Sequence, residues 1–121
     1  MATVDITGEN FNATIADNDI VFLDFWASWC GPCRSFAPTY EAASEEHPDI
    51  VFGMINTEAE ADLATTFQVR SIPTLAVIRE GVMVFRESGA LSAGGLAKVI
   101  EGVRGLDMAA IHAEVAAQEK K

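Results

Sequence analysis

The sequence predicts a single α/β domain in which one central β-sheet is flanked by helices. Apolar runs alternate with amphipathic segments along the chain, a pattern typical of layered α/β domains. The 121 residues, of which 50% are hydrophobic, suffice for one buried core and are too few to favour two. We therefore assign residues 1–105 to one domain and residues 106–121 to a C-terminal helical extension of it.

The expected strands are short, and two signals define them. Ile20 to Trp26 is almost entirely apolar, which predicts a strand buried on both faces. The Glu80-Gly81 pair is a turn signal between two apolar runs and predicts a β-hairpin. The expected strands span residues 2–6, 20–26, 50–56, 74–78 and 82–85. They predict a mixed central sheet of four or five strands.

The expected helices follow from apolar spacing and from capping residues. Ser92 and Asp107 are suitable N-caps for two helices near the C-terminus, and Gly105 ends the first of these. Pro38 lies inside a longer helix that ends near His47-Pro48, and we expect it to kink that helix. The expected helices cover a short segment after Thr7 with Phe11 and Ile15 on one side, the segment after Trp29, residues 59–67, residues 92–105 and the segment after Asp107.

Composition excludes some functions. Lys and Arg number 8 and Asp and Glu 18, so a phosphate-binding surface is not expected and neither is a nucleic-acid partner. Asp5 stands where a signal peptide would carry basic residues, and the longest apolar run is far shorter than the roughly 20 residues of a membrane span. We expect a soluble, cytoplasmic protein without membrane association. In that reducing compartment, a lone cysteine pair is typical of catalysis or metal binding rather than of structural cross-linking.

Cys30 and Cys33 are the only cysteines. Two residues between them at a helix start bring the sulfurs within bonding distance, so the pair can cycle between dithiol and disulfide. Cys33 begins the core-facing stripe that continues through Phe36, Ala37 and Tyr40, and it should point inward. Cys30 precedes that stripe and is expected to carry the exposed sulfur.

The stretch Asp24-Phe25-Trp26-Ala27-Ser28-Trp29-Cys30-Gly31-Pro32-Cys33 resembles the active-site segment of the thioredoxin family. The resemblance continues at Pro38, Ser71-Ile72-Pro73-Thr74, Gly81 and Gly89, and covers roughly residues 4 to 104. It implies a thioredoxin fold with an extra C-terminal helix, and a redox-active Cys30–Cys33 pair that reduces protein disulfides. It also implies a monomer that binds no metal or cofactor, and a flavin-dependent thioredoxin reductase, supplied by NADPH, as the electron donor.

The resemblance assigns a role to each reacting group. Cys30 is expected to attack the substrate disulfide, and Cys33 to resolve the mixed disulfide. Well-oriented intramolecular attack reaches effective molarities of about 10⁵ M or more, so the position of Cys33 should contribute more than thiol acidity. Asp24, inside an apolar strand, should have a raised pKa and exchange a proton with Cys33. Thioredoxins commonly carry a lysine where this chain has Met54. The absence of that positive charge should raise the pKa of Asp24 further.

A substrate groove is expected beside the cysteines. The resemblance implies a cis bond before Pro73, which would present the backbone groups of Ser71 and Ile72 to an extended peptide. Trp26 is expected to pack beside the disulfide, whereas His47 and His112 are expected to be surface residues without a role. The remaining groove residues would be Trp29, Gly31, Pro32, Gly89 and Ala90.

Three alternatives remain open at this point. Half of a tetrahedral zinc site is present, and two chains could share one metal. The extension after Gly105 could make the domain a partner-binding or scaffold subunit with little turnover, although packing of that helix on its own domain is favoured. An oxidant or isomerase is the third alternative, but Gly31-Pro32 between the cysteines favours a reductant.

Overall fold

The computed structural model describes residues 2–120 and contains a five-stranded mixed sheet in the order β1-β3-β2-β4-β5. Strands β1, β3 and β2 run parallel, and β4 and β5 are antiparallel to their neighbours. The strands are β1 (Thr3–Asp5), β2 (Ile20–Trp26), β3 (Val51–Asn56), β4 (Thr74–Arg79) and β5 (Val82–Ser88). The predicted mixed sheet is confirmed.

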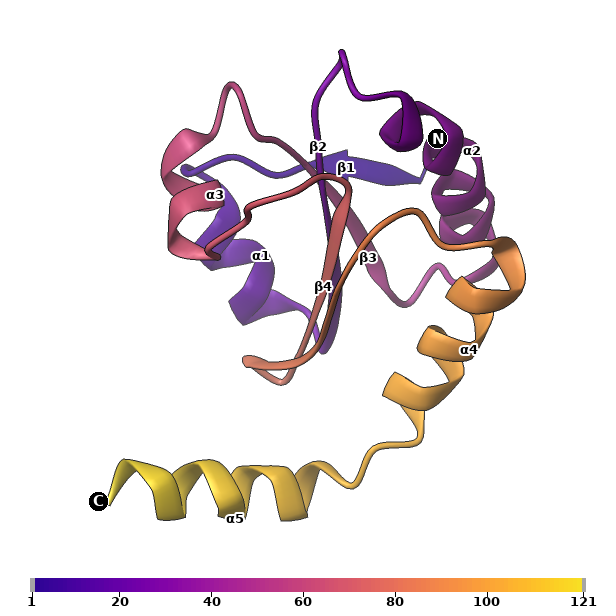
Figure 1. Ribbon diagram of the computed structural model, residues 1–121. Helices are drawn as coiled ribbons and strands as arrows, with labels where there is room; N and C mark the ends of the chain where they lie inside the picture. The colour runs from indigo at the N-terminus through magenta and orange to yellow at the C-terminus, as the bar shows by residue number, and fades with distance from the viewer. Residues whose placement is uncertain (1, 121) are drawn as a thin grey trace.

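Helices cover both faces of the sheet (Figure 1). The first core cluster joins one face to α2 and α4, and the second fills the other face, on the side of α1 and α3. The helices are α1 (Phe11–Asp17), α2 (Gly31–Glu46), α3 (Ala61–Thr66), α4 (Ala93–Arg104) and α5 (Met108–Glu119). The sheet is therefore the middle layer of three.

Strand β2 is the centre of the fold, and its apolar sequence explains why. Its residues from Ile20 to Phe25 are buried, and alternate side chains enter the two cores. Phe22 stacks against Phe52 of β3 on the side of α2, whereas Leu23 lies in the opposite core. The expected strand with two buried faces is confirmed.

Local capping signals also hold. The Ser92 hydroxyl accepts a hydrogen bond from the Gly95 N–H at 3.0 Å, and the Asp107 carboxylate accepts one from the Ala110 N–H at 3.1 Å. Glu80 and Gly81 have φ angles of 51° and 79°, as a tight hairpin turn requires. The expected N-caps at Ser92 and Asp107 and the expected turn at Glu80-Gly81 are therefore confirmed.

Helix α3 and strand β5 differ most from their expected bounds, and the other strands differ by no more than one residue at either end. Helix α3 begins at Ala61 rather than at residue 59, and the Glu60 side chain before it accepts a hydrogen bond from the Gly8 N–H at 2.8 Å. Strand β5 continues to Ser88, three residues beyond the expected end, because its last residues stay paired with β4 up to Thr74. At both places, a residue distant in sequence contacts the end of the element.

Helix α5 is held mainly at its start. Met108 is buried, Ile111 and Val115 are partly exposed, and the other residues up to Lys120 are exposed. His112 Nε2 lies 2.9 Å from Glu80 Oε1, and the helix extends along one end of the sheet (Figure 1). The residues of its expected apolar stripe are thus the least exposed ones of the helix, although only Met108 is fully buried. No helix within residues 2–120 is long and apolar enough to cross a membrane.

Candidate active site

Cys30 and Cys33 lie where β2 passes into α2. Cys30 is the N-cap of α2, and its sulfur accepts a hydrogen bond from the Cys33 N–H at 3.2 Å. Gly31 and Pro32 form the exposed first positions of the helix, where the missing N–H of proline costs no hydrogen bond. The start of the helix thus directs the Cys33 N–H at the Cys30 sulfur, and the helix dipole also favours negative charge there.

The two cysteines form a disulfide. Their Sγ atoms are 2.27 Å apart, their Cα atoms 5.2 Å, and χ3 is 79°. Cys33 points inward as expected, with 3% of its surface exposed. The expectation of an exposed Cys30 sulfur is wrong for this oxidised form, because Cys30 is only 4% exposed. The loop that ends at Pro73 lies against Cys30 and shields it from solvent. The helical spacing of apolar residues does not predict this contact.

That loop has the expected cis peptide bond between Ile72 and Pro73. The Ile72 carbonyl oxygen lies 3.7 Å from Cys30 Sγ. A disulfide sulfur carries no hydrogen, so this approach is a packing contact in the oxidised form and becomes a hydrogen bond only with the thiol. Among the described residues, the backbone N–H of Ile72 donates to no other group. Ile72 therefore presents an unpaired donor and acceptor beside the disulfide.

A shallow depression of about 310 Å³ adjoins this loop. It is lined by Trp29, Thr57, Ala64, Val69, Arg70, Ser71 and Ile72. Trp29 is 67% exposed, and its indole N–H donates to the Glu58 carboxylate. Gly89 and Ala90 are exposed at the end of β5 but, like Gly31 and Pro32, do not line this depression. Of the expected groove residues, the depression thus unites Trp29, Ser71 and Ile72.

Sequence reasoning missed four lining residues. Val69 and Arg70 directly precede Ser71 and could have been found by extending the loop motif. Thr57 follows β3, and the carboxyl ends of parallel strands such as β2 and β3 share one edge of the sheet. Ala64 lies in α3, and no sequence signal connects it with the cysteines.

Asp24 is completely buried in β2, on the sheet face that α2 covers. Burial raises the pKa of Asp24 to about 7, which confirms the expected direction. Neither carboxylate oxygen has a hydrogen-bond partner within the described part of the chain. Met54 is its direct neighbour on β3, as expected from the sequence, so no lysine is there to hold the charged form. Asp24 can thus gain or lose a proton near neutral pH.

Tyr40 of α2 is the other buried ionisable side chain near this face. Burial raises the pKa of Tyr40 well above its ordinary value, and the charge of Asp24 adds to that effect. Its hydroxyl donates to the Gly53 carbonyl of β3 at 2.8 Å. Tyr40 therefore stays protonated and ties α2 to the sheet.

Two other expectations concern Trp26 and the histidines. Trp26 is half-buried at the end of β2, and its indole N–H has no partner among residues 2–120. His47 lies 3.0 Å from the Arg104 guanidinium, and His112 pairs with Glu80, both away from the cysteines. No group of three or more His, Cys, Asp or Glu side chains in the described residues is placed to hold a metal ion.

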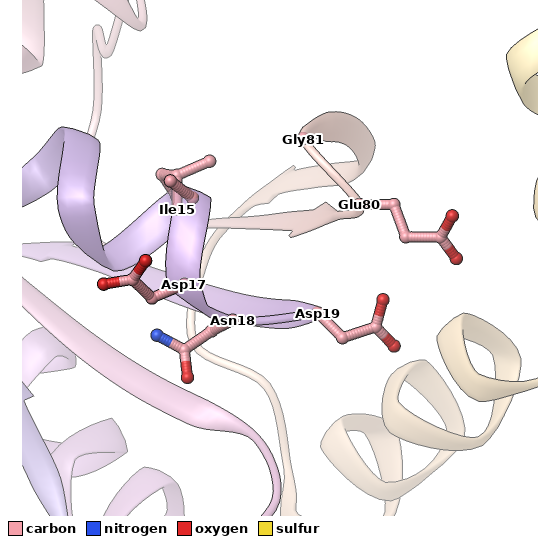
Figure 2. A pocket seen from close by; sticks show the side chains of 7 residues that line it. Ile15, Asp17, Asn18, Asp19, Glu80 and Gly81 are labelled. Atoms are coloured by element: carbon pink, nitrogen blue, oxygen red, sulfur yellow. The ribbon is translucent and has the colours of Figure 1, made fainter.

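A second depression, of about 410 Å³, lies at the opposite end of β2 from the cysteines (Figure 2). Asp17, Asn18 and Asp19 line it just before β2 begins, together with Glu80 and Gly81 of the hairpin turn. It contains no cysteine and no basic side chain, so it offers no disulfide chemistry.

A mixed sheet with a Cys-x-x-Cys disulfide at a helix start and a cis-proline loop beside it defines a thiol-disulfide oxidoreductase. The profile of the Thioredoxin family matches residues 2–102, and the chain belongs to this family. A Streptomyces coelicolor protein assigned as thioredoxin 2 is 50% identical over 118 residues, which cover 98% of this chain and 88% of that protein. A thioredoxin of Mycobacterium bovis is 36% identical, over 84% of this chain and 90% of its own.

Solved structures of thioredoxins have the same fold as this chain. A mutant thioredoxin from Halobacterium salinarum superposes with a TM-score of 0.80 at 30% identity, covering 86% of this chain and 92% of its own. Plasmodium falciparum thioredoxin gives a TM-score of 0.76, also at 30% identity, over 83% of this chain and 97% of its own. Family membership establishes a redox-active disulfide without a bound cofactor. It also implies a reductase and disulfide substrates as partners.

Proposed function

We propose that Cys30 is the attacking thiol in the reduction of protein disulfides and that Cys33 is the resolving thiol. The observation that carries this proposal is the Cys30 sulfur beside the unpaired backbone of Ile72. An extended peptide that pairs with Ile72 as an added strand would bring its own disulfide against Cys30. The Cys33 N–H bond to the Cys30 sulfur, at the start of α2, supports the thiolate form of Cys30.

The proposed exchange has two steps. The Cys30 thiolate attacks one substrate sulfur, breaks the substrate disulfide, and releases the other substrate sulfur as a thiolate. The Cys33 thiolate then attacks the Cys30 sulfur, closes the Cys30–Cys33 disulfide, and releases the second substrate thiolate. Two electrons pass to the substrate, and the protein becomes oxidised. A reductase returns two electrons to the pair before the next turnover.

Asp24 is proposed to take the proton of the Cys33 thiol before the second step. Its raised pKa, about 7, makes both protonation states accessible at neutral pH. Its carboxylate lies on the sheet face covered by the helix whose first turn carries Cys33. The proton that Asp24 accepts is passed on when the substrate thiolate leaves.

We also propose partners and a compartment more specific than family membership implies. The reductant would be a flavin-dependent thioredoxin reductase that uses NADPH, acting on a cytoplasmic, monomeric protein without nucleic-acid or membrane partners. Residues 1–105 would form the working domain, with residues 106–121 as an extension of it. The acidic composition supports the exclusion of nucleic acid.

An insulin-reduction assay coupled to NADPH and a thioredoxin reductase tests the proposal. Wild-type protein is expected to turn over, and the Cys30→Ser and Cys33→Ser variants to lose turnover. Cys33→Ser should in addition trap substrate as a mixed disulfide, visible as an adduct in non-reducing mass spectrometry. An adduct formed by Cys30→Ser instead would reverse the two roles. An inactive wild type would contradict the proposal and favour a partner-binding or scaffold subunit.

A further inference from the structure

The segment of residues 68–73 places the Ile72 backbone beside Cys30, but it has no regular secondary structure of its own. Its position therefore depends on how its two ends are held. At the end near β4, the Thr74 hydroxyl donates to the Ser71 carbonyl at 2.6 Å, and the Gly89 N–H donates to the Pro73 carbonyl at 2.8 Å. Since the Thr74 hydrogen is used in this way, the Ser88 hydroxyl must donate to Thr74 across their 3.2 Å separation.

The other end of the segment is held by Arg86 of β5. Its Nη2 donates to the Gln68 carbonyl at 2.8 Å, and its Nη1 donates to the Phe67 carbonyl. These carbonyls follow α3, where the last carbonyls of a helix lack intrahelical partners. Gln68 also has a φ of 54°, the left-handed conformation that turns the chain away from the helix axis. A guanidinium fork that binds both carbonyls fixes the direction in which the segment leaves α3.

Edge strand β5 thus holds one end of the segment directly through Arg86 and supports the other end through the Ser88 hydrogen bond to Thr74 of β4. Arg86 stands opposite Ala76 and Ser88 opposite Thr74, so Arg86 and Ser88 are two residues apart on the same face of β5. The same face of strand β5 therefore contributes to the position of both ends of residues 68–73.

We propose that Arg86 is a positioning residue for substrate binding, which acts by fixing the start of the segment that carries Ile72. This inference rests on the proposed function, because it assumes that a protein substrate pairs with Ile72. The Arg86 hydrogen bonds go to backbone carbonyls, not to the cysteines. Arg86 should therefore affect the binding of extended peptides and leave the exchange chemistry unchanged.

Arg79 of β4 provides a matched control. Its Nη1 donates to the Val103 and Arg104 carbonyls at 2.7 and 3.2 Å, again at the end of a helix. The chemistry resembles that of Arg86, but the site is at the far end of the sheet, next to α5. Loss of Arg79 should lower stability without changing substrate binding.

The test compares wild type with Arg86→Met, Arg86→Lys and Arg79→Met. Two substrates are used: insulin, which can pair with the segment, and dithiobis(nitrobenzoate), a small disulfide without a peptide backbone. Hydrogen exchange of residues 69–72 measures how firmly the segment is held, and thermal unfolding measures stability.

In Arg86→Met, the KM for insulin is expected to rise by about three- to tenfold, the cost of losing charge-assisted hydrogen bonds that hold the binding segment. Its kcat and its rate with the small disulfide should stay near wild type, and residues 69–72 should exchange faster. Arg86→Lys, which keeps the charge but not the fork, should fall between the two. Arg79→Met should unfold at a lower temperature with an unchanged KM.

Three results would overturn the role of Arg86: an unchanged KM in Arg86→Met, an equal rise of KM in Arg79→Met, or unchanged exchange of residues 69–72. These results differ from failure of the proposed function, in which wild type itself does not reduce insulin. Even then, the exchange measurement decides whether Arg86 holds the segment.

Discussion

The polar groups at the two ends of the central strand β2 differ in how they are partnered. Near its carboxyl end, Asp24 is buried without a hydrogen-bond partner, and the Ile72 N–H donates to no group in the described chain. Beyond its amino end, Arg79 Nη1 donates to carbonyls in the last turn of α4, and Glu80 pairs with His112. The Arg79 Nε makes no hydrogen bond within residues 2–120 but lies 3.8 and 3.9 Å from the Asp19 and Glu80 carboxylates. The unpartnered Asp24 carboxylate can exchange a proton, and the free Ile72 N–H can bind a peptide. The contacts of Arg79 and Glu80 instead stabilise the fold. The difference marks one end as reactive and the other as structural.

The strongest test of this difference replaces Asp24 by Asn. Since burial raises the pKa of Asp24 from 3.8 to about 7, folding favours the protonated form. This contribution to stability is fully present below pH about 4 and is lost as pH rises through about 7. Asp24→Asn should therefore be more stable than wild type at pH 8 by up to about 4 kcal/mol, with little difference at pH 4. Urea unfolding at both pH values measures this, and parallel pH profiles would contradict it.

A second test adds charge beside Asp24. Met54→Lys places a cation next to the carboxylate on the adjoining strand and should lower the pKa of Asp24 by about one pH unit or more. Met83→Lys, the same change at an exposed position on β5, should leave that pKa unaltered. NMR titration of Asp24 compares the three proteins. An unchanged or higher pKa in Met54→Lys would show that the missing lysine does not explain the raised value.

The structural end is tested by removal of residues 107–121. Because α5 is attached at the end of the sheet away from the cysteines, insulin turnover should be unchanged. Stability should fall by about 1–3 kcal/mol, mainly through the lost burial of Met108. Turnover and denaturant unfolding check the two parts, and sedimentation checks the oligomeric state. A large loss of turnover, or a change of oligomeric state, would assign α5 a role in partner binding.

The smallest effects concern two glycines. Gly89 has a φ of 104°, and its N–H holds the Pro73 carbonyl, so Gly89→Ala should destabilise by about 1–2 kcal/mol through backbone strain. Gly102 lies in α4 with open space around an added methyl group, so Gly102→Ala should stabilise by about 0.5–1 kcal/mol. Thermal unfolding distinguishes the two signs, and equal signs would contradict this account of Gly89.

Much of this architecture was predictable because its causes are local. The β2 strand, the Glu80-Gly81 turn and the caps at Ser92 and Asp107 each depend on neighbouring residues, and each lies where expected. The raised pKa of Asp24 was also predictable, since an acid within a two-sided apolar strand is buried wherever that strand packs.

Other features depend on residues that meet only after folding. Cys30 is covered by a loop some forty residues away in the sequence. Thr57 and Ala64 line the depression because the sheet and α3 bring them there. Arg86 binds carbonyls eighteen and nineteen residues earlier in the chain. Periodicity and caps report which face of an element is apolar and where it begins and ends. Exposure of a sulfur and the choice of hydrogen-bond partners depend instead on which segments the packed sheet brings side by side.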